Sequence, residues 1–313
     1  MTVRTRTYFS EGAAIAADLY TPDNMTQGKL YPAVGLCQGF TGIRATPVIE
    51  GLGKALNEAG YVAIAFDYRG WGDSGGERGR LAPLEQVDDI RNTITFLETL
   101  EFVDADRIGL VGISYGCLTA PHAAAVDTRV KAVLGCLGVA TGYSAVTNVR
   151  TPAQMTEWES KVAAARRRRV LFNEVDRTLR VLDVFLDEQS VAKLPLMWDA
   201  VPLWRNLLGF DSIGRVMDHR PIDVVHRIAP RALGLLCAAN DTCADPDSLR
   251  EMFDAAQEPK RWIGIDGIGH FDLYAGEGFE RFKKEIIGFF DEFLAASRGA
   301  DRSGVSRATG TLG

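Results

Sequence analysis

The pentapeptide Gly112-Ile113-Ser114-Tyr115-Gly116 is the part of the sequence that decides the fold. Residues 106–111 before it form a short apolar run opened by a charged pair, as a buried strand would, and residues 117–126 after it are mostly small and compatible with a helix. Strand, tight turn and helix are the surroundings of a nucleophile elbow, in which the turn strains the serine backbone and the glycines allow close approach. The alternative is a Gly-Ser-Gly loop without chemistry, which these surroundings disfavour.

Strand-like apolar runs alternate with helical patterns along most of the chain. Such alternation predicts an α/β fold, with a mostly parallel central sheet flanked by helices, and the first two strands are expected to form an antiparallel hairpin. The strands are expected at 2–9, 13–20, 31–37, 61–66, 106–111, 130–139, 232–238 and 262–265, and helices at 84–100, 117–126, 246–256 and 277–296.

The alternation stops between residues 142 and 214, where there is no convincing strand and several aromatic side chains occur. We expect this segment to be a helical cap inserted into an α/β core formed by residues 1–141 and 215–296. The remaining residues, 297–313, are rich in Gly, Ser, Thr and Arg, which is typical of a flexible tail.

Composition and charge narrow the function classes. The 313 residues are 46% hydrophobic and 24% charged, as in an ordinary globular protein. The formal net charge of −6 disfavours a nucleic-acid partner, and the four arginines at 166–169 have acidic neighbours, as on a solvated helix face. We therefore expect a small-molecule substrate and no nucleic-acid partner, and leave a homodimer open.

Compartment and metal content are judged from three features. No apolar stretch is long enough to span a membrane, and the N-terminus lacks the apolar region of a secretory signal. The five cysteines follow neither a C-x-x-C nor a zinc-ligand spacing, and free thiols favour a reducing compartment. These features predict a cytoplasmic protein with no membrane partner and no metal.

A serine hydroxyl becomes a nucleophile only when an oriented base removes its proton. The chain has four histidines, of which His122 falls in the helix after the pentapeptide, and His219 and His226 flank the end of the insertion. His270 lies in a glycine-bracketed loop, after a strand and before the last helix. Because the base follows the nucleophile and the acid in an elbow-type enzyme, His270 is the predicted base.

The acid is expected between Ser114 and His270, in the loop after the strand at 232–238. Asp241 is nearest to the end of that strand and is the predicted acid, although a surface turn residue would look the same. Asp245 and Asp247 stand where a helix cap and first turn favour carboxylates.

The tetrahedral intermediate needs two backbone N–H donors. One is expected from Tyr115, directly after the nucleophile, and the other from the loop at 38–42, at Phe40. A second glycine motif, G-x-G-x-x-G at 70–75, follows a strand as a dinucleotide site would. Gly76, Gly79 and Pro83 keep the chain irregular where such a site needs a helix, so a structural loop and no cofactor are expected.

Taken in order, the segments 38–42, 67–74, 112–116 and 269–271 together with Asp241 resemble the α/β-hydrolase superfamily from about residue 2 to 296, outside the insertion. The segments 11–22 and 270–274 look like its dienelactone-hydrolase-like and X-prolyl-peptidase-like branch. Dienelactone hydrolases proper carry a cysteine nucleophile, whereas this chain has Ser114, which favours an esterase-like enzyme. Relatives usually have histidine where this chain has Gln38, and glutamine can still hydrogen-bond to the loop.

The residues and the resemblance together predict a cofactor-independent serine hydrolase. It would cleave an ester, lactone or thioester of a small, largely apolar substrate through an acyl-enzyme on Ser114, with His270 as base. The same three residues would support carbon–carbon bond hydrolysis, amide or peptide cleavage, or a non-hydrolytic rearrangement, and a non-catalytic binding protein is a further alternative.

The cap is expected to cover the nucleophile and select the substrate. Gln38, Trp198 and Trp204 are the predicted substrate-binding residues. The alternative for the cap aromatics is that they only hold the cap on the core. The aromatic residues of the insertion are Trp158, Phe172, Phe185, Trp198, Trp204 and Phe210.

Overall fold

The computed structural model describes residues 1–23, 25–199 and 207–294 of the chain. Its centre is an eight-stranded sheet in the order β1-β2-β4-β3-β5-β6-β9-β10. β1 and β2 form the N-terminal hairpin, β2 pairs antiparallel with β4, and all other pairs are parallel. This confirms the predicted α/β fold. The strands are β1 (Thr2–Ser10), β2 (Ala13–Thr21), β3 (Tyr31–Cys37), β4 (Val62–Phe66), β5 (Val103–Ile113), β6 (Val130–Cys136), β9 (Ala232–Ala238) and β10 (Lys260–Ile265).

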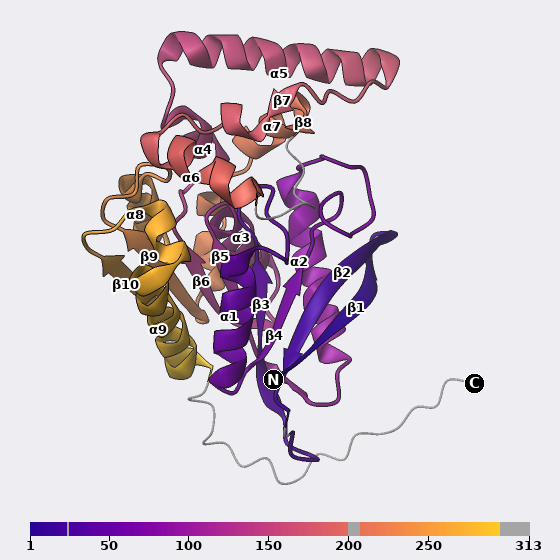
Figure 1. The fold of residues 1–313 in the computed structure, drawn as a ribbon, viewed down its shortest axis with the longest axis vertical. Coiled ribbons are helices and arrows are strands. Elements are labelled where there is room, and N and C mark those ends of the chain that lie inside the picture. Colours follow the sequence, from indigo (N-terminus) through magenta and orange to yellow (C-terminus); the bar gives the residue numbers. More distant parts are fainter. Residues whose placement is uncertain (24, 200–206, 295–313) are drawn as a thin grey trace.

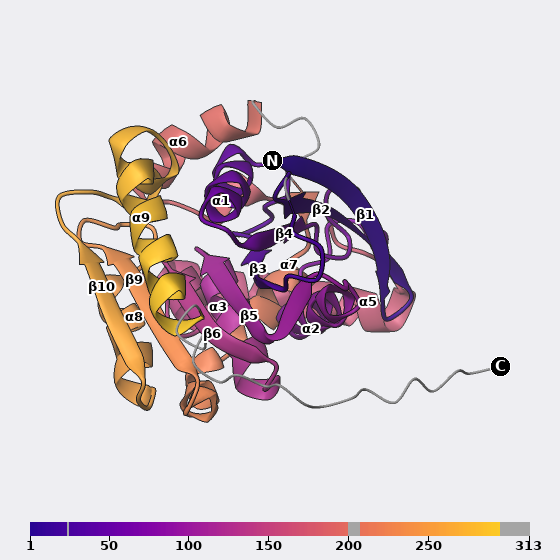
Figure 2. The same cartoon turned by 90° about the horizontal axis from the view of Figure 1, so that it is seen from below.

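Helices cover both faces of the sheet (Figure 2). One face is covered by α1 (Pro47–Glu58) and α9 (Gly276–Phe293), and the other by α2 (Pro83–Glu98), α3 (Gly116–Val126) and α8 (Pro246–Ala255). Successive strand side chains point to opposite faces, so a buried strand must be apolar on both sides. In β5, Ile108 and Leu110 belong to one core cluster while Val111 and Ile113 belong to the other.

Between β6 and β9 lies the segment that the sequence predicts to be a cap, and its helix α5 crosses the molecule at the end away from the N-terminus (Figure 1). The segment contains a two-residue antiparallel ladder of β7 and β8, so the prediction that it has no strand was wrong. Its division from the core at residues 142 and 214 stays a prediction, and α7 runs across the second boundary. The cap elements are α4 (Gly142–Thr147), α5 (Pro152–Phe172), β7 (Leu179–Arg180), the 3-10 turn η1 (Val181–Asp183), α6 (Glu188–Asp199), β8 (Leu207–Leu208) and α7 (Phe210–Met217).

Three further 3-10 turns complete the described elements, η2 (Pro221–Asp223), η3 (Val225–Ile228) and η4 (His270–Tyr274). The arginine run on α5 is engaged in ion pairs: Arg166 with Asp218, Arg168 with Glu174 and Arg169 with Glu77. None of the described helices is both long and apolar enough to cross a bilayer. The predicted tail, 297–313, lies outside the described residues.

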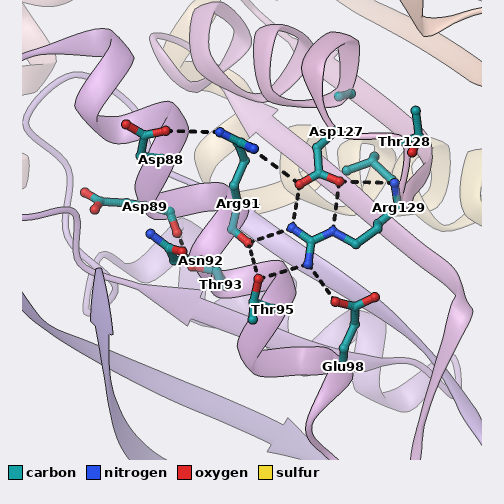
Figure 3. A network of polar contacts seen from close by, with 12 residues as sticks. Asp88, Asp89, Arg91, Asn92, Thr93, Thr95, Glu98, Asp127, Thr128 and Arg129 are labelled. Carbon is teal, nitrogen blue, oxygen red and sulfur yellow. Dashed lines mark hydrogen bonds and ion pairs between the residues drawn. The ribbon is translucent and has the colours of Figure 1, made fainter. Parts of the chain in front are cut away.

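A polar network fixes α2 to the start of β6 (Figure 3). The Arg129 guanidinium donates to both carboxylate oxygens of Asp127, at 2.9 and 2.6 Å, and to Glu98 and Thr95 on α2, at 2.6 and 2.9 Å. The hydrogen bond to Asp127 is the main reason why the pKa of Arg129 is raised. α2 also packs against α3, the helix that follows the Gly112–Gly116 pentapeptide.

Candidate active site

Ser114 lies between the end of β5 and the start of α3, with a φ of 55°. This left-handed conformation is rare for a residue with a side chain, and such strain is concentrated at functional sites. The two glycines of the pentapeptide are required by space. A Cβ on Gly112 would overlap the carbonyl oxygen of Gly116, and a Cβ on Gly116 would overlap that of Cys37. The strand–turn–helix geometry expected from the sequence is therefore present.

His270 follows β10 and opens the turn η4, with 1% of its surface exposed. Its Nε2 lies 3.1 Å from the Ser114 Oγ, within hydrogen-bond range. The His270 Nδ1 lies 2.8 Å from Oδ2 of Asp241. A carboxylate only accepts hydrogen bonds, so Nδ1 carries the proton and the Nε2 lone pair faces the Ser114 hydroxyl. The imidazole is therefore oriented as a base toward Ser114.

Asp241 stands three residues after β9 and is buried. Its second oxygen, Oδ1, accepts the backbone N–H groups of Cys243 and Ala244 at 2.9 and 2.8 Å. These two bonds hold the carboxylate in one orientation and leave Oδ2 for the histidine. Asp245 has another task, because its side chain accepts the N–H of Asp247 and caps α8.

The other histidines lie elsewhere. His122 and His219 stack with ring centroids 4.8 Å apart, and His219 Nε2 donates to the carbonyl of Leu118 at 3.0 Å. Burial lowers the pKa of His219 to about 4 and also lowers the pKa of His122, so both rings are neutral near pH 7. His226 lies in η3. The structure thus brings Ser114, Asp241 and His270 together and leaves the remaining histidines out.

The expected oxyanion donors are Phe40, in the loop after β3, and Tyr115, directly after Ser114. Their rings contact edge to face, with centroids 5.7 Å apart. Within the described ranges no acceptor is bonded to the backbone N–H of either residue. A Cβ on Gly39, next to Phe40, would lie 3.5 Å from the Ser114 Cβ, so this loop passes directly over the nucleophile.

Gln38 has a different place from the one predicted. Its side chain is fully buried and its Nε2 donates to the carbonyl of Phe66, at the end of β4, at 2.8 Å. It is absent from the residues that line either cavity beside Ser114. Because Gln38 directly follows β3, whose neighbour is β4, its amide bonds across the sheet to β4. Its role in substrate binding stays a prediction.

Two apolar cavities meet at Ser114. The larger one also reaches His270, and the smaller one extends to Val216 of the cap. The cap aromatic in both walls is Phe185; of Trp198 only the backbone is described, in α6, and Trp204 lies outside the described residues. Four residues line both cavities: Phe40, Ser114, Phe185 and Cys243.

Tyr274 is a residue of the site that sequence reasoning missed. Its hydroxyl lies 3.2 Å from His270 Nε2. Burial raises the pKa of Tyr274 well above its usual value, so the hydroxyl keeps its proton. The available signal was its spacing, four residues after the predicted base in a segment that forms one helical turn.

The glycine motif at 70–75 forms a loop around the buried Asp67. A Cβ on Gly72 would overlap the Asp67 carboxylate, which accepts the N–H of Asp73 at 3.0 Å and pairs with Arg44. The next helix, α2, begins only at Pro83, so the helix that a dinucleotide site needs is missing from this turn. Among the described side chains, no three of the His, Cys, Asp or Glu type gather as a metal site would require.

Comparison with known proteins agrees with this architecture. A model of the alpha/beta hydrolase family matches residues 39–282. The chain is 31% identical over 270 residues to an uncharacterized 31.7 kDa protein from the traX-finO intergenic region of Escherichia coli, covering 84% of this chain and 92% of that protein. It is 27% identical over 255 residues to a thiohydrolase of Eupenicillium brefeldianum, covering 80% and 82%. The crystal structure of hypothetical protein PA2218 from Pseudomonas aeruginosa has the same fold, with a TM-score of 0.80, 24% identity and 94% of each chain covered.

The fold with its elbow and the family match define the protein as a hydrolase. The chain belongs to the alpha/beta hydrolase family. The narrower resemblance to the dienelactone-hydrolase-like branch stays a prediction.

Proposed function

We propose that the protein cleaves an ester or thioester of a small, largely apolar acid through an acyl-enzyme on Ser114. The observation that carries this proposal is the chain of contacts from Ser114 Oγ to His270 Nε2, at 3.1 Å, and from Nδ1 to Asp241, at 2.8 Å. A nucleophile, a base and an orienting carboxylate in this order are what activation of a serine hydroxyl requires.

In the first half-reaction, Oγ of Ser114 bonds to the carbonyl carbon while its proton moves to His270 Nε2. The negative oxygen of the tetrahedral intermediate accepts the N–H groups of Phe40 and Tyr115. The bond to the leaving oxygen or sulfur then breaks, and the Nε2 proton passes to that atom. In the second half-reaction, water gives a proton to Nε2 and attacks the acyl carbon, and Ser114 recovers its proton as the acid leaves.

The substrate class follows from the cavity walls. Apart from His270, the residues that line the two cavities are uncharged, and most are apolar. A buried charge without a partner is strongly unfavourable, so the parts of the substrate inside the protein should be neutral. The thiohydrolase relative extends the proposal from oxygen esters to thioesters.

The experiment is active-site labelling of the folded protein with a fluorophosphonate, followed by peptide mass analysis. We expect the label on Ser114, no label in Ser114→Ala, and strongly slowed labelling in His270→Ala. Ester and thioester turnover should disappear with Ser114→Ala. An unlabelled Ser114 in the folded wild type would refute the proposal, and turnover that survives Ser114→Ala but not His270→Ala would indicate carbon–carbon or lyase chemistry.

Other expectations remain proposals of the same kind. Amide or peptide cleavage, a rearrangement and a non-catalytic binding role use the same residues and are separated by the variants above. A cytoplasmic location is proposed because all five cysteines are free and buried. Whether the protein forms a homodimer is decided by measuring its mass in solution.

A further inference from the structure

A glutamine of the cap contacts both loops that carry the base and the acid. Gln189, in the first turn of α6, accepts the backbone N–H of His270 through Oε1 at 2.9 Å. Its Nε2 donates to the backbone carbonyl of Asn240, also at 2.9 Å. Asn240 directly precedes Asp241. One side-chain amide therefore links the backbone of the base to the backbone beside the acid, from an element outside the central sheet.

The neighbouring glycine shows how closely this amide is fitted. A Cβ on Gly269 would overlap both the oxygen and the nitrogen of the Gln189 amide. Gly269 has a φ of −104°, which any residue adopts, so its backbone conformation does not require glycine. The Gln189 amide occupies the space that such a Cβ would need, so a side chain at position 269 would have to displace this amide.

A second contact joins the same end of α6 to the acid loop. Oδ1 of Asp187 accepts the N–H of Ser190 at 2.9 Å, which caps the first turn of α6, and the hydroxyl of Thr242 at 3.1 Å. Thr242 is the residue after Asp241. The start of α6 is therefore attached to the acid loop on both sides of the carboxylate.

We propose that Gln189 is a positioning residue, which holds the His270 and Asp241 loops at the spacing that activates Ser114 and makes this spacing depend on how the cap sits. The inference rests on the proposed function for its catalytic consequence. Only a side chain with one acceptor and one donor can serve both partners, and an amide has both. A carboxylate at this position would accept from His270 but could not donate to Asn240.

The first experiment measures the contact itself, independently of activity. Hydrogen exchange of the backbone amides at 266–275 is compared in the wild type, Gln189→Ala, Gln189→Met and the control Glu188→Gln, which alters the exposed residue next to it. The His270 amide should exchange faster in both Gln189 variants and as in wild type in the control. Unchanged exchange in both Gln189 variants would overturn the inference.

The second experiment measures the consequence with a p-nitrophenyl ester. A displacement of about 1 Å at the reacting groups lowers the rate by up to about 100-fold, so Gln189→Ala and Gln189→Met should lower kcat about 10- to 100-fold with KM nearly unchanged. Gln189→Glu should not restore it. A rise in KM with an unchanged kcat, or faster exchange of the His270 amide with an unchanged kcat, would refute the positioning role. A wild type that turns over neither an ester nor a thioester would refute the proposed function, while the exchange measurement would still decide the contact.

A double-variant cycle makes the test specific. Gly269→Ala should lower kcat when Gln189 is present, because the added Cβ overlaps the amide. In the Gln189→Ala background the same change should lower kcat by a several-fold smaller factor, since the overlap is gone. Thermal unfolding of each variant shows whether it is folded. Losses that simply multiply would mean that the two residues act independently and would contradict the inference.

Discussion

Replacing Tyr274 by phenylalanine removes one hydroxyl near His270 Nε2 and keeps the ring. In the resting enzyme the Ser114 and Tyr274 hydroxyls lie 3.1 and 3.2 Å from Nε2, so they compete for one lone pair. In the proposed reaction the leaving atom takes its proton from the same nitrogen, which places that atom beside the Tyr274 hydroxyl. The variant therefore has two opposing effects on acylation.

The magnitudes separate these effects. A hydrogen bond between neutral groups contributes about 0.5–1.5 kcal/mol, so relief of the competition would speed acylation by at most about tenfold. A hydrogen bond to a charged group contributes about 1.5–3 kcal/mol, so its loss at a developing alkoxide would slow acylation about 10- to 100-fold. A p-nitrophenolate leaves as a stable anion and needs little such help.

The assay compares kcat/KM for the p-nitrophenyl and ethyl esters of one short acid. The relief of competition acts on both esters, so Tyr274→Phe should lower the ratio of kcat/KM for the ethyl ester to kcat/KM for the p-nitrophenyl ester about tenfold or more. The value for the p-nitrophenyl ester itself should stay within a few-fold of wild type or rise above it. Tyr61→Phe is the matched control, because it removes a hydroxyl bonded to Asp291 at 2.7 Å, at the opposite end of the parallel strands from Ser114. Equal losses on both esters would refute the reasoning.

Three further predictions concern stability. Burial lowers the folded-state pKa of His219 from 6.5 to about 4, so the unfolded chain binds the proton first and the folded state is destabilised as the pH falls between these values. Chemical denaturation at pH 7 and pH 4 measures this effect. Between these two pH values the free energy of unfolding should fall by about 3 kcal/mol more in the wild type than in His219→Gln. Gly116→Ala should lower the free energy of unfolding by about 1–3 kcal/mol, because the added Cβ overlaps the Cys37 carbonyl. Gly288→Ala on α9 has open space around it and should not lower this free energy. Equal effects of the two variants in denaturant would contradict the packing argument. Arg129→Met should lower the free energy of unfolding by only about 1 kcal/mol, because the ion pairs of Arg129 are partly exposed. A larger loss in the same measurement would contradict this estimate.

The central sheet and the elbow could be predicted because their signals are local. An apolar run, a glycine pair around Ser114 and a small-residue helix follow one another without a gap, and each constrains the next. The histidine and the aspartate were assigned from chain order alone, and the folded chain brings both to the serine. Their catalytic roles stay predictions until the variants are measured.

The misplaced and missed residues depend on contacts that the sequence does not display. The direction of the Gln38 side chain is set by β4, which joins β3 through a crossover, so its partner is the carbonyl of Phe66. The β7–β8 ladder is only two residues long on each side and leaves no alternating pattern. Gln189 and His270 are 81 positions apart, and no local pattern could pair them.

The size of the effect predicted for Gln189 is limited by what the core already does. β9 and β10 are parallel neighbours, so the acid and base loops leave the sheet side by side. The N–H of Asn240 also donates to the carbonyl of Ile268 at 3.0 Å, which ties the loops together without the cap. Loss of Gln189 should therefore shift the His270 and Asp241 loops slightly relative to Ser114 and should not separate the two loops from each other. The Gln189→Ala variant should therefore keep an activity well above that of Ser114→Ala. A loss as complete as that of Ser114→Ala would mean that the bond from Asn240 to Ile268 alone cannot hold the loops.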